Sequence, residues 1–272
     1  MALLAGYLWR VVLAMKANFT PKPPQAALDY FRDKALTPSF HHLDVYREEH
    51  GIAFAVAKAT ALDILEVIHN AVDQALAEGR TLAQFKKELT PVLQQLGWWG
   101  ESEVVDPVTG ETVNAQLGSP RRLKVIYRTN LRTARATGQW YRIQRSQQTH
   151  PYLLYQLGPS ENHREQHQAW EGLLLKADDP FWKTHFPPNG WGCKCRVRQV
   201  SKIEHQRLAD SNRYQTQAPK PEQVQWTNKR TGEVKQVEKG IDPGWDHNPG
   251  QARKKHLDTL LEEKQQAARK RL

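Results

Sequence analysis

The sequence predicts an α+β protein with a predominantly helical N-terminal part, a small mixed α/β core domain and a C-terminal part made of a hairpin and a helix. Two observations lead to this fold class. Apolar residues recur at steps of three and four over residues 25–96 and 120–147, which is the period of amphipathic helices. Short strand-like runs follow at 152–155 and 223–237. We expect four regions, which span residues 1–23, 24–118, 119–200 and 201–272.

Composition narrows the class of protein. The chain has 272 residues, 39 Lys and Arg against 29 Asp and Glu, a formal net charge of +10 and two cysteines. Chains of this size can bury a core without disulfides, and so few cysteines exclude a disulfide-rich secreted scaffold. The basic excess favours an acidic partner such as nucleic acid or an acidic protein surface.

Residues 1–23 are predicted to be an N-terminal extension of uncertain structure. The apolar run from Met1 to Met15 is interrupted by Arg10 and is shorter than the roughly 20 residues that a membrane helix needs. Its charged residues, Arg10 and Lys16, lie within and after the apolar run, whereas those of a secretory signal precede it. We expect neither a membrane span nor a cleaved signal here.

Helices are predicted throughout residues 25–96. Gly79 and Gly97 follow two of the apolar runs, where C-cap glycines are expected, and Thr81 can cap the next helix. The Asp-Pro and Thr-Gly pairs within residues 104–113 then predict a small hairpin or loop. We interpret the whole of residues 24–118 as a helical scaffold.

A basic stripe marks the helix predicted over residues 120–147. No Asp or Glu occurs between Glu111 and Glu161, whereas eight Lys and Arg do. Helical spacing places six of these on one edge of the helix. Such a stripe can bind nucleic acid or an acidic partner, and the alternative is a solvated face. The six residues are Arg121, Lys124, Arg128, Arg132, Arg135 and Arg142.

Histidines and cysteines gather in the following segment. His163 and His167 are four residues apart, so on a helix both imidazoles reach one metal ion, and Cys193 and Cys195 can supply two thiolates. This set is a candidate site for structural zinc, with His185 as a spare ligand. Alternatively, the histidines are surface groups and the cysteines behave as small buried hydrophobic residues. A disulfide across one intervening residue would be strained, so reduced thiols are expected.

Nothing in the sequence predicts catalytic residues. The chain lacks an HExxH motif, a Walker loop, a GxSxG elbow and a glycine-rich dinucleotide fingerprint. The enzyme alternative is a metal-dependent nuclease or another metal-site enzyme, with Glu161 or Glu165 as the base. Tryptophans such as Trp98, Trp182 and Trp191 are expected to pack against other residues rather than to stack on bases.

The C-terminal part predicts a hairpin and a helix. Strand-like runs flank the turn sequence at residues 228–232, and a loop rich in Gly and Pro covers residues 240–250. Residues 251–272 have the composition of a basic terminal helix.

Several short motifs, taken in order, resemble those of a known family. Asp178-Asp179-Pro180-Phe181-Trp182, followed by residues 187–197 (PPNGWGCKCRV), is similar to the core signature of the phage Mu F-like head morphogenesis family. Residues 27–36, 48–57 and 96–100 resemble its helical N-terminal part. Tyr127-Arg128-Thr129-Asn130 resembles the entry to its core domain, and residues 240–250 resemble the loop that follows. The resemblance covers residues 24–250.

The resemblance implies a minor head protein that acts in procapsid assembly, portal-vertex association and DNA packaging or delivery, without an enzymatic activity. It implies phage portal and capsid proteins as partners, with non-specific DNA contact and no membrane. It places the protein in the virion, in the capsid interior or at the portal vertex, and in the host cytoplasm during assembly. Glu161 and His163 stand where the family pattern has Asp and Arg, so His163 is the weakest of the four predicted zinc ligands.

Overall fold

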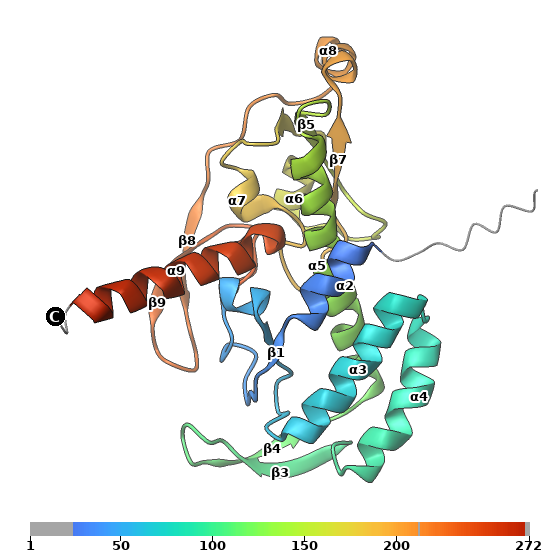
Figure 1. The fold of residues 1–272 in the computed structure, drawn as a ribbon, viewed down its shortest axis with the longest axis vertical. Coiled ribbons are helices and arrows are strands. Elements are labelled where there is room, and N and C mark those ends of the chain that lie inside the picture. The colour runs from blue at the N-terminus through green and yellow to red at the C-terminus, as the bar shows by residue number, and fades with distance from the viewer. Residues whose placement is uncertain (1–23, 212, 270–272) are drawn as a thin grey trace, which may run out of the picture.

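The computed structural model describes residues 24–211 and 213–269 and has an α+β fold, as predicted (Figure 1). Helices form most of the N-terminal part, and small sheets occupy the rest of the chain. The predicted extension at residues 1–23 lies outside the described residues. Within the described residues, no helix has both the length and the apolar character needed to cross a membrane.

From residue 24 on, the N-terminal part contains three α-helices and a long irregular connection. Its elements are α2 (Gln25–Arg32), β1 (Ala35–Leu36), the 3-10 helix η1 (Arg47–Gly51), β2 (Ala53–Phe54), α3 (Leu62–Glu78) and α4 (Leu82–Gln95). The predicted caps are confirmed: Gly79 ends α3 with a φ of 71°, and the Thr81 side chain accepts a hydrogen bond from the Gln84 N–H.

Residues 33–61 differ from the continuous helical pattern that the sequence suggested. They form β1, η1, β2 and loops, although Phe40, Val45 and Phe54 are buried as apolar helix residues would be. Pro38 explains part of the difference, because proline disfavours helical geometry in the residue before it. The apolar pattern therefore predicted correctly which of these side chains are buried. The prediction of a helical backbone for this segment was wrong.

A hairpin and one long helix connect the two halves of the chain. Strands β3 (Glu101–Val105) and β4 (Thr112–Gln116) form an antiparallel hairpin, which is one of the two alternatives, hairpin or loop, that the sequence predicts here. Helix α5 (Pro120–Ser146) follows, with the Ser119 side chain accepting a hydrogen bond from the Arg122 N–H at its start. The predicted helix over residues 120–147 is confirmed.

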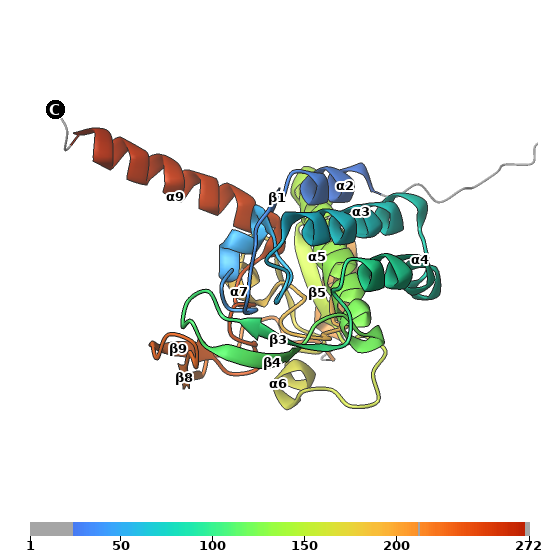
Figure 2. The same ribbon diagram turned by 90° about the horizontal axis from the view of Figure 1, so that it is seen from below.

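The second half is built on a three-stranded antiparallel sheet of order β6-β5-β7. Short helices surround this sheet, and a separate hairpin and a long helix complete the chain. The elements are β5 (Tyr152–Gln156), α6 (Glu165–Ala169), β6 (Leu174–Lys176), α7 (Trp182–His185), β7 (Arg196–Val200), α8 (Lys202–Asp210), β8 (Gln223–Thr227), β9 (Val234–Glu238) and α9 (Pro249–Arg269). Helix α9 packs at its start against η1 and α5 and then projects away from the body (Figures 1 and 2).

Two large hydrophobic clusters hold the structure, with a third, small one at Leu154, Leu174 and Val200, and α5 contributes to both large clusters. The first cluster joins α2, α3 and α4 to the N-terminal half of α5, from Leu123 to Ala134. The second joins the C-terminal half of α5, from Ala136 to Ile143, to the sheet and to α7. Trp98 and Trp182 are buried in these clusters, as expected, whereas 43% of Trp191 is exposed.

Candidate functional site

A histidine and two cysteines meet where α6 approaches the loop before β7. His167 lies on α6, and Cys193 and Cys195 lie on the loop. The candidate ligand atoms of the three residues all lie within 4.8 Å of one another. His167 Nδ1 is 3.4 Å from Cys195 Sγ and 3.9 Å from Cys193 Sγ. We call these three residues the sulfur–imidazole cluster, and its donor set can bind a metal ion.

The orientation of His167 suits a metal ligand. Its Nε2 lies 2.8 Å from the carbonyl oxygen of Gly240, which can only accept a hydrogen bond. Nε2 therefore carries the proton, and the lone pair of Nδ1 points toward the two sulfurs. An imidazole held by a backbone carbonyl in this way is the usual arrangement for a metal-binding histidine. The His167 ring also stacks on Trp170, with 4.9 Å between the ring centroids.

The two thiols differ in acidity because they share a proton. The hydrogen bond from Cys195 lowers the pKa of Cys193. The same hydrogen bond, together with burial, raises the pKa of Cys195. One thiolate therefore forms readily, and thiolates are the form of cysteine that binds metals. Both cysteines are free rather than joined in a disulfide.

Asp242 attaches the cysteine loop to the start of α6. Its carboxylate accepts hydrogen bonds from the Arg164 guanidinium at 2.8 Å and from the Trp191 N–H at 2.7 Å. Gly158 provides a second contact, because it lies so close to the Lys194 carbonyl that a Cβ atom there would overlap it. Sequence reasoning missed both residues, and the only local signal for Asp242 was its place in a loop rich in Gly and Pro.

His163 lies outside the sulfur–imidazole cluster. Helix α6 begins at Glu165, so His163 and His167 do not share a helix, and His163 Nε2 lies 2.8 Å from the Gly158 carbonyl oxygen. His185 is also separate, because its Nε2 pairs with Glu238 at 2.8 Å. The structure thus brings together three of the four predicted zinc ligands.

The predicted basic stripe lies on α5, beside the cysteine loop. Five of its six residues are exposed, and Arg132, which is partly buried, donates a hydrogen bond to the Cys193 carbonyl. Burial lowers the pKa of Arg132. Arg132, Arg135 and Arg142 line one cavity of about 450 Å³, together with Lys194 and Arg196.

This cavity reaches the sulfur–imidazole cluster. Cys193 and Cys195 form part of its lining, and no Asp or Glu among the described residues does. Within the described ranges, none of the six stripe residues forms an ion pair. Lys194 and Arg196 extend the basic surface beyond the predicted helix. The basic stripe was predicted from residue spacing along one helix, and that spacing gives no information on residues outside the helix.

Comparison with known proteins assigns the chain to a family. The sequence model of the family described as "Phage Mu protein F like protein" matches residues 66–198, a range that contains the sulfur–imidazole cluster. The "Putative capsid assembly protein F" of Escherichia phage Mu is 36% identical over 241 residues, which are 85% of this chain and 55% of that protein. The "Mu-like prophage FluMu F protein" of Haemophilus influenzae is 36% identical over 217 residues, or 75% of this chain and 50% of that protein.

The chain belongs to the Mu F-like family, which confirms the resemblance drawn from its motifs. It spans about half the length of these curated relatives. No solved structure matches it.

Proposed function

We propose that this protein is a minor head protein of a Mu-like tailed phage or prophage and acts in head morphogenesis. The observation that carries the proposal is the match of 85% of the chain to a protein named for capsid assembly. The finer role is in procapsid assembly at the portal vertex and in DNA packaging or delivery, with phage portal and capsid proteins as partners. The protein would act without catalysis, in the host cytoplasm during assembly and then within the virion.

The basic stripe supports contact with DNA or with acidic head proteins. Its exposed guanidinium groups can attract phosphates without reading sequence, and salt weakens such binding. Arg132 is a poor residue to test because it also holds the cysteine loop. The informative variant is therefore Arg128→Ser, Arg135→Ser and Arg142→Ser combined.

This variant has a control with the same loss of charge. Lys87, Lys202 and Arg207 are exposed residues on α4 and α8, and serine can replace all three. We expect only the stripe variant to lose DNA binding, with the slope of log K against log salt falling by about 0.9 for each lost phosphate contact. Equal binding by both variants would assign the stripe to the solvated surface.

We further propose that the sulfur–imidazole cluster binds structural zinc. The cluster connects a short helix to an irregular loop, so that a bound metal ion would add its binding free energy to the stability of the fold. His167 and Cys193 are 3% and 8% exposed, and this burial suits a structural ion. Zinc bound to purified protein, and its loss in His167→Ala, would support the assignment. Protein that is free of zinc yet equally stable would refute it.

One observation favours a second candidate function, a metal-dependent nuclease. The cluster supplies three ligands, whereas structural zinc takes four and catalytic zinc keeps one position open. The cysteines also line the basic cavity, which could hold a phosphate. Metal-dependent cleavage of DNA that is lost in His167→Ala would establish this activity.

The experiment that tests the assembly role is co-purification with the portal protein encoded at the same locus, at moderate salt and with or without a chelator. Recovery of a defined complex supports the role. Loss of that complex on chelation would link the metal to assembly. Failure to associate under every condition, with DNA cleavage by the same preparation, would instead favour the nuclease.

A further inference from the structure

A separate cavity lies between the irregular N-terminal loop and α5. Its volume is about 260 Å³, and Val45, Phe54 and Ile126 form part of its apolar wall. A smaller cavity of about 60 Å³ adjoins it, because five residues line both. The shared residues are Lys34, His50, Thr129, Asn130 and Trp191. We call the two together the Lys34 pocket.

The polar lining of the Lys34 pocket is basic. No Asp or Glu among the described residues lines either cavity, and residues 1–23, 212 and 270–272 contain none. The basic side chains of its wall are Lys34, His42, His50, Arg121, Arg122 and His247.

The charge of Lys34 has no partner within the part of the chain that the structure describes. Its Nζ lies over the Tyr30 ring, 4.7 Å from the centroid, and forms neither an ion pair nor a hydrogen bond there. Burial lowers its pKa to about 7, since the charged form loses its hydration. The Lys34 side chain is half-buried, so its charged form loses part of its hydration without gaining a counter-charge, and a bound anion would offset that loss.

His247 provides a second, independent observation. It is 7% exposed, lines the smaller cavity, and has a buried Nδ1 with no hydrogen-bond partner among the described atoms. Buried polar atoms in folded proteins usually have a partner. An acceptor or donor from a ligand would satisfy this one.

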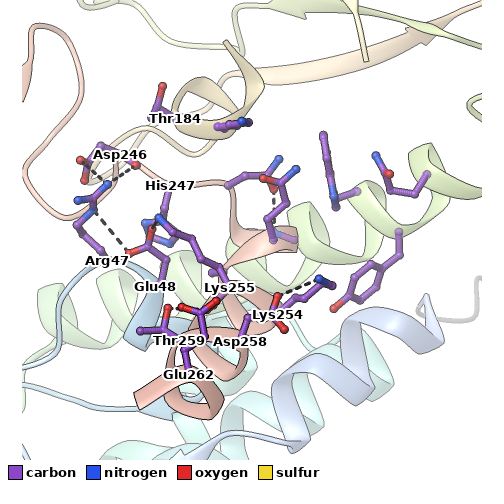
Figure 3. A pocket seen from close by; sticks show the side chains of 18 residues that line it. Arg47, Glu48, Thr184, Asp246, His247, Lys254, Lys255, Asp258, Thr259 and Glu262 are labelled. Atoms are coloured by element: carbon purple, nitrogen blue, oxygen red, sulfur yellow. Dashed lines mark hydrogen bonds and ion pairs between the residues drawn. The ribbon is translucent and has the colours of Figure 1, made fainter. Parts of the chain in front are cut away.

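The neighbouring cavity, beside α9 and η1, shows the contrast (Figure 3). Its volume is about 880 Å³, and its lining has four Lys or Arg side chains and four Asp or Glu side chains, so the formal charges balance. Arg47 pairs there with Asp246 at 3.2 Å, and Lys255 pairs with Glu48 at 2.5 Å. His247 lies between this balanced cavity and the Lys34 pocket, where the carboxylates are missing.

We propose that the Lys34 pocket binds a phosphate monoester with a small aromatic or apolar body. Lys34 would hold the phosphate as a point charge, and His50 and His247, which burial keeps neutral near pH 6, would donate hydrogen bonds to it. The apolar wall and Trp191 would contact the body. A cavity of about 150 Å³ is enough to hold benzene, so the larger cavity has room for one ring. This proposal does not depend on the sulfur–imidazole cluster or on the basic stripe.

The test is calorimetric titration of the full chain with phenyl phosphate at pH 6.0 and constant ionic strength. Benzoate measures the requirement for phosphate, and benzyl alcohol measures the requirement for charge. We expect binding of phenyl phosphate, weaker binding of benzoate and none of benzyl alcohol. Lys34→Met should weaken phenyl phosphate by roughly ten- to a hundred-fold, since it removes a charged hydrogen bond. Lys87→Met, on the exposed surface of α4, is the matched control.

Several results would overturn the proposal. They are equal affinity for phenyl phosphate and benzyl alcohol, unchanged affinity in Lys34→Met, or no binding of phenyl phosphate at millimolar concentration. If Lys34→Met does not fold, Val125→Trp takes its place, because Val125 lines the cavity but is 43% exposed. The added ring should block phenyl phosphate while the circular dichroism spectrum is unchanged, and unblocked binding would count against the pocket.

Discussion

Arg230 joins three distant segments of the chain, and replacing it is the sharpest test of the fold. It follows β8 and forms ion pairs with Asp106, which follows β3, and with Asp44 in the N-terminal loop. Its Nη1 and Nη2 lie 2.5 and 3.0 Å from the two oxygens of Asp106, and its Nε lies 2.6 Å from Asp44. The Arg230 and Asp106 side chains are only 10% and 8% exposed. This two-pronged geometry is the strong form of the arginine–carboxylate pair.

The loss of stability expected in Arg230→Met depends on the interactions that Asp106 and Asp44 keep in the variant. Methionine keeps much of the apolar stem, but Asp106 is left buried with only backbone donors such as the Val108 N–H. Breaking a buried ion pair by removing one partner costs about 3–5 kcal/mol. Asp44 adds less, because its side chain is 23% exposed and still accepts a hydrogen bond from the Phe40 N–H. At about 2–4 °C per kcal/mol for a chain of this size, Tm should fall by about 6–20 °C.

Thermal unfolding followed by circular dichroism measures this change. The control is Lys239→Met, which breaks an ion pair with Glu222 whose side chains are 46% and 69% exposed. Such a pair contributes about 0–1 kcal/mol, so the Tm of the control should change little. If Arg230→Met and Lys239→Met have the same Tm, the conclusion that burial makes the Arg230–Asp106 ion pair important for stability is wrong.

Three further predictions concern the core, the cysteine loop and pH. Leu65→Ala should lower the free energy of unfolding by about 2–5 kcal/mol because Leu65 is 0% exposed, whereas Leu62→Ala, at a 57% exposed site, should change little in the same urea titration. Gly158→Ala should push Lys194 away and reduce bound zinc measured by mass spectrometry, and full zinc occupancy would contradict this. Burial lowers the pKa of His247 to about 4, so the unfolded chain, with a histidine pKa near 6.5, binds the proton more tightly. His247 alone should therefore contribute a loss of about 3 kcal/mol of stability from pH 6.5 to 4, and His247→Gln should remove that contribution while leaving the one from His50, whose pKa burial lowers to about 3.

Local signals account for what the sequence predicted about the fold. Thr81 caps α4 and Gly79 ends α3 through interactions within a few residues, so the sequence alone contains them. Residues 33–61 could not be predicted in this way. Their apolar side chains pack against distant elements, and tertiary packing rather than helical propensity determines their backbone.

The sequence predicted the candidate ligand residues of the site, but it did not predict the groups that hold them in position. His167, Cys193 and Cys195 belong to residue types that bind metals, so their meeting could be anticipated. The carbonyl of Gly240 that orients His167 comes from 73 residues away, and no side chain marks it. The Lys34 pocket could not be predicted from the sequence for the same reason, because its basic residues come from residues 34–50, from α5 and from the loop before α9.

The sharing of α5 by both hydrophobic clusters has a mechanical consequence. At about 1.5 Å per residue, its 27 residues form a rod about 40 Å long. One end is embedded among α3 and α4, and the middle holds the cysteine loop through Arg132. A displacement of the helical scaffold is therefore transmitted to the cysteine loop along a stiff helix, so the two regions should move together rather than about a hinge.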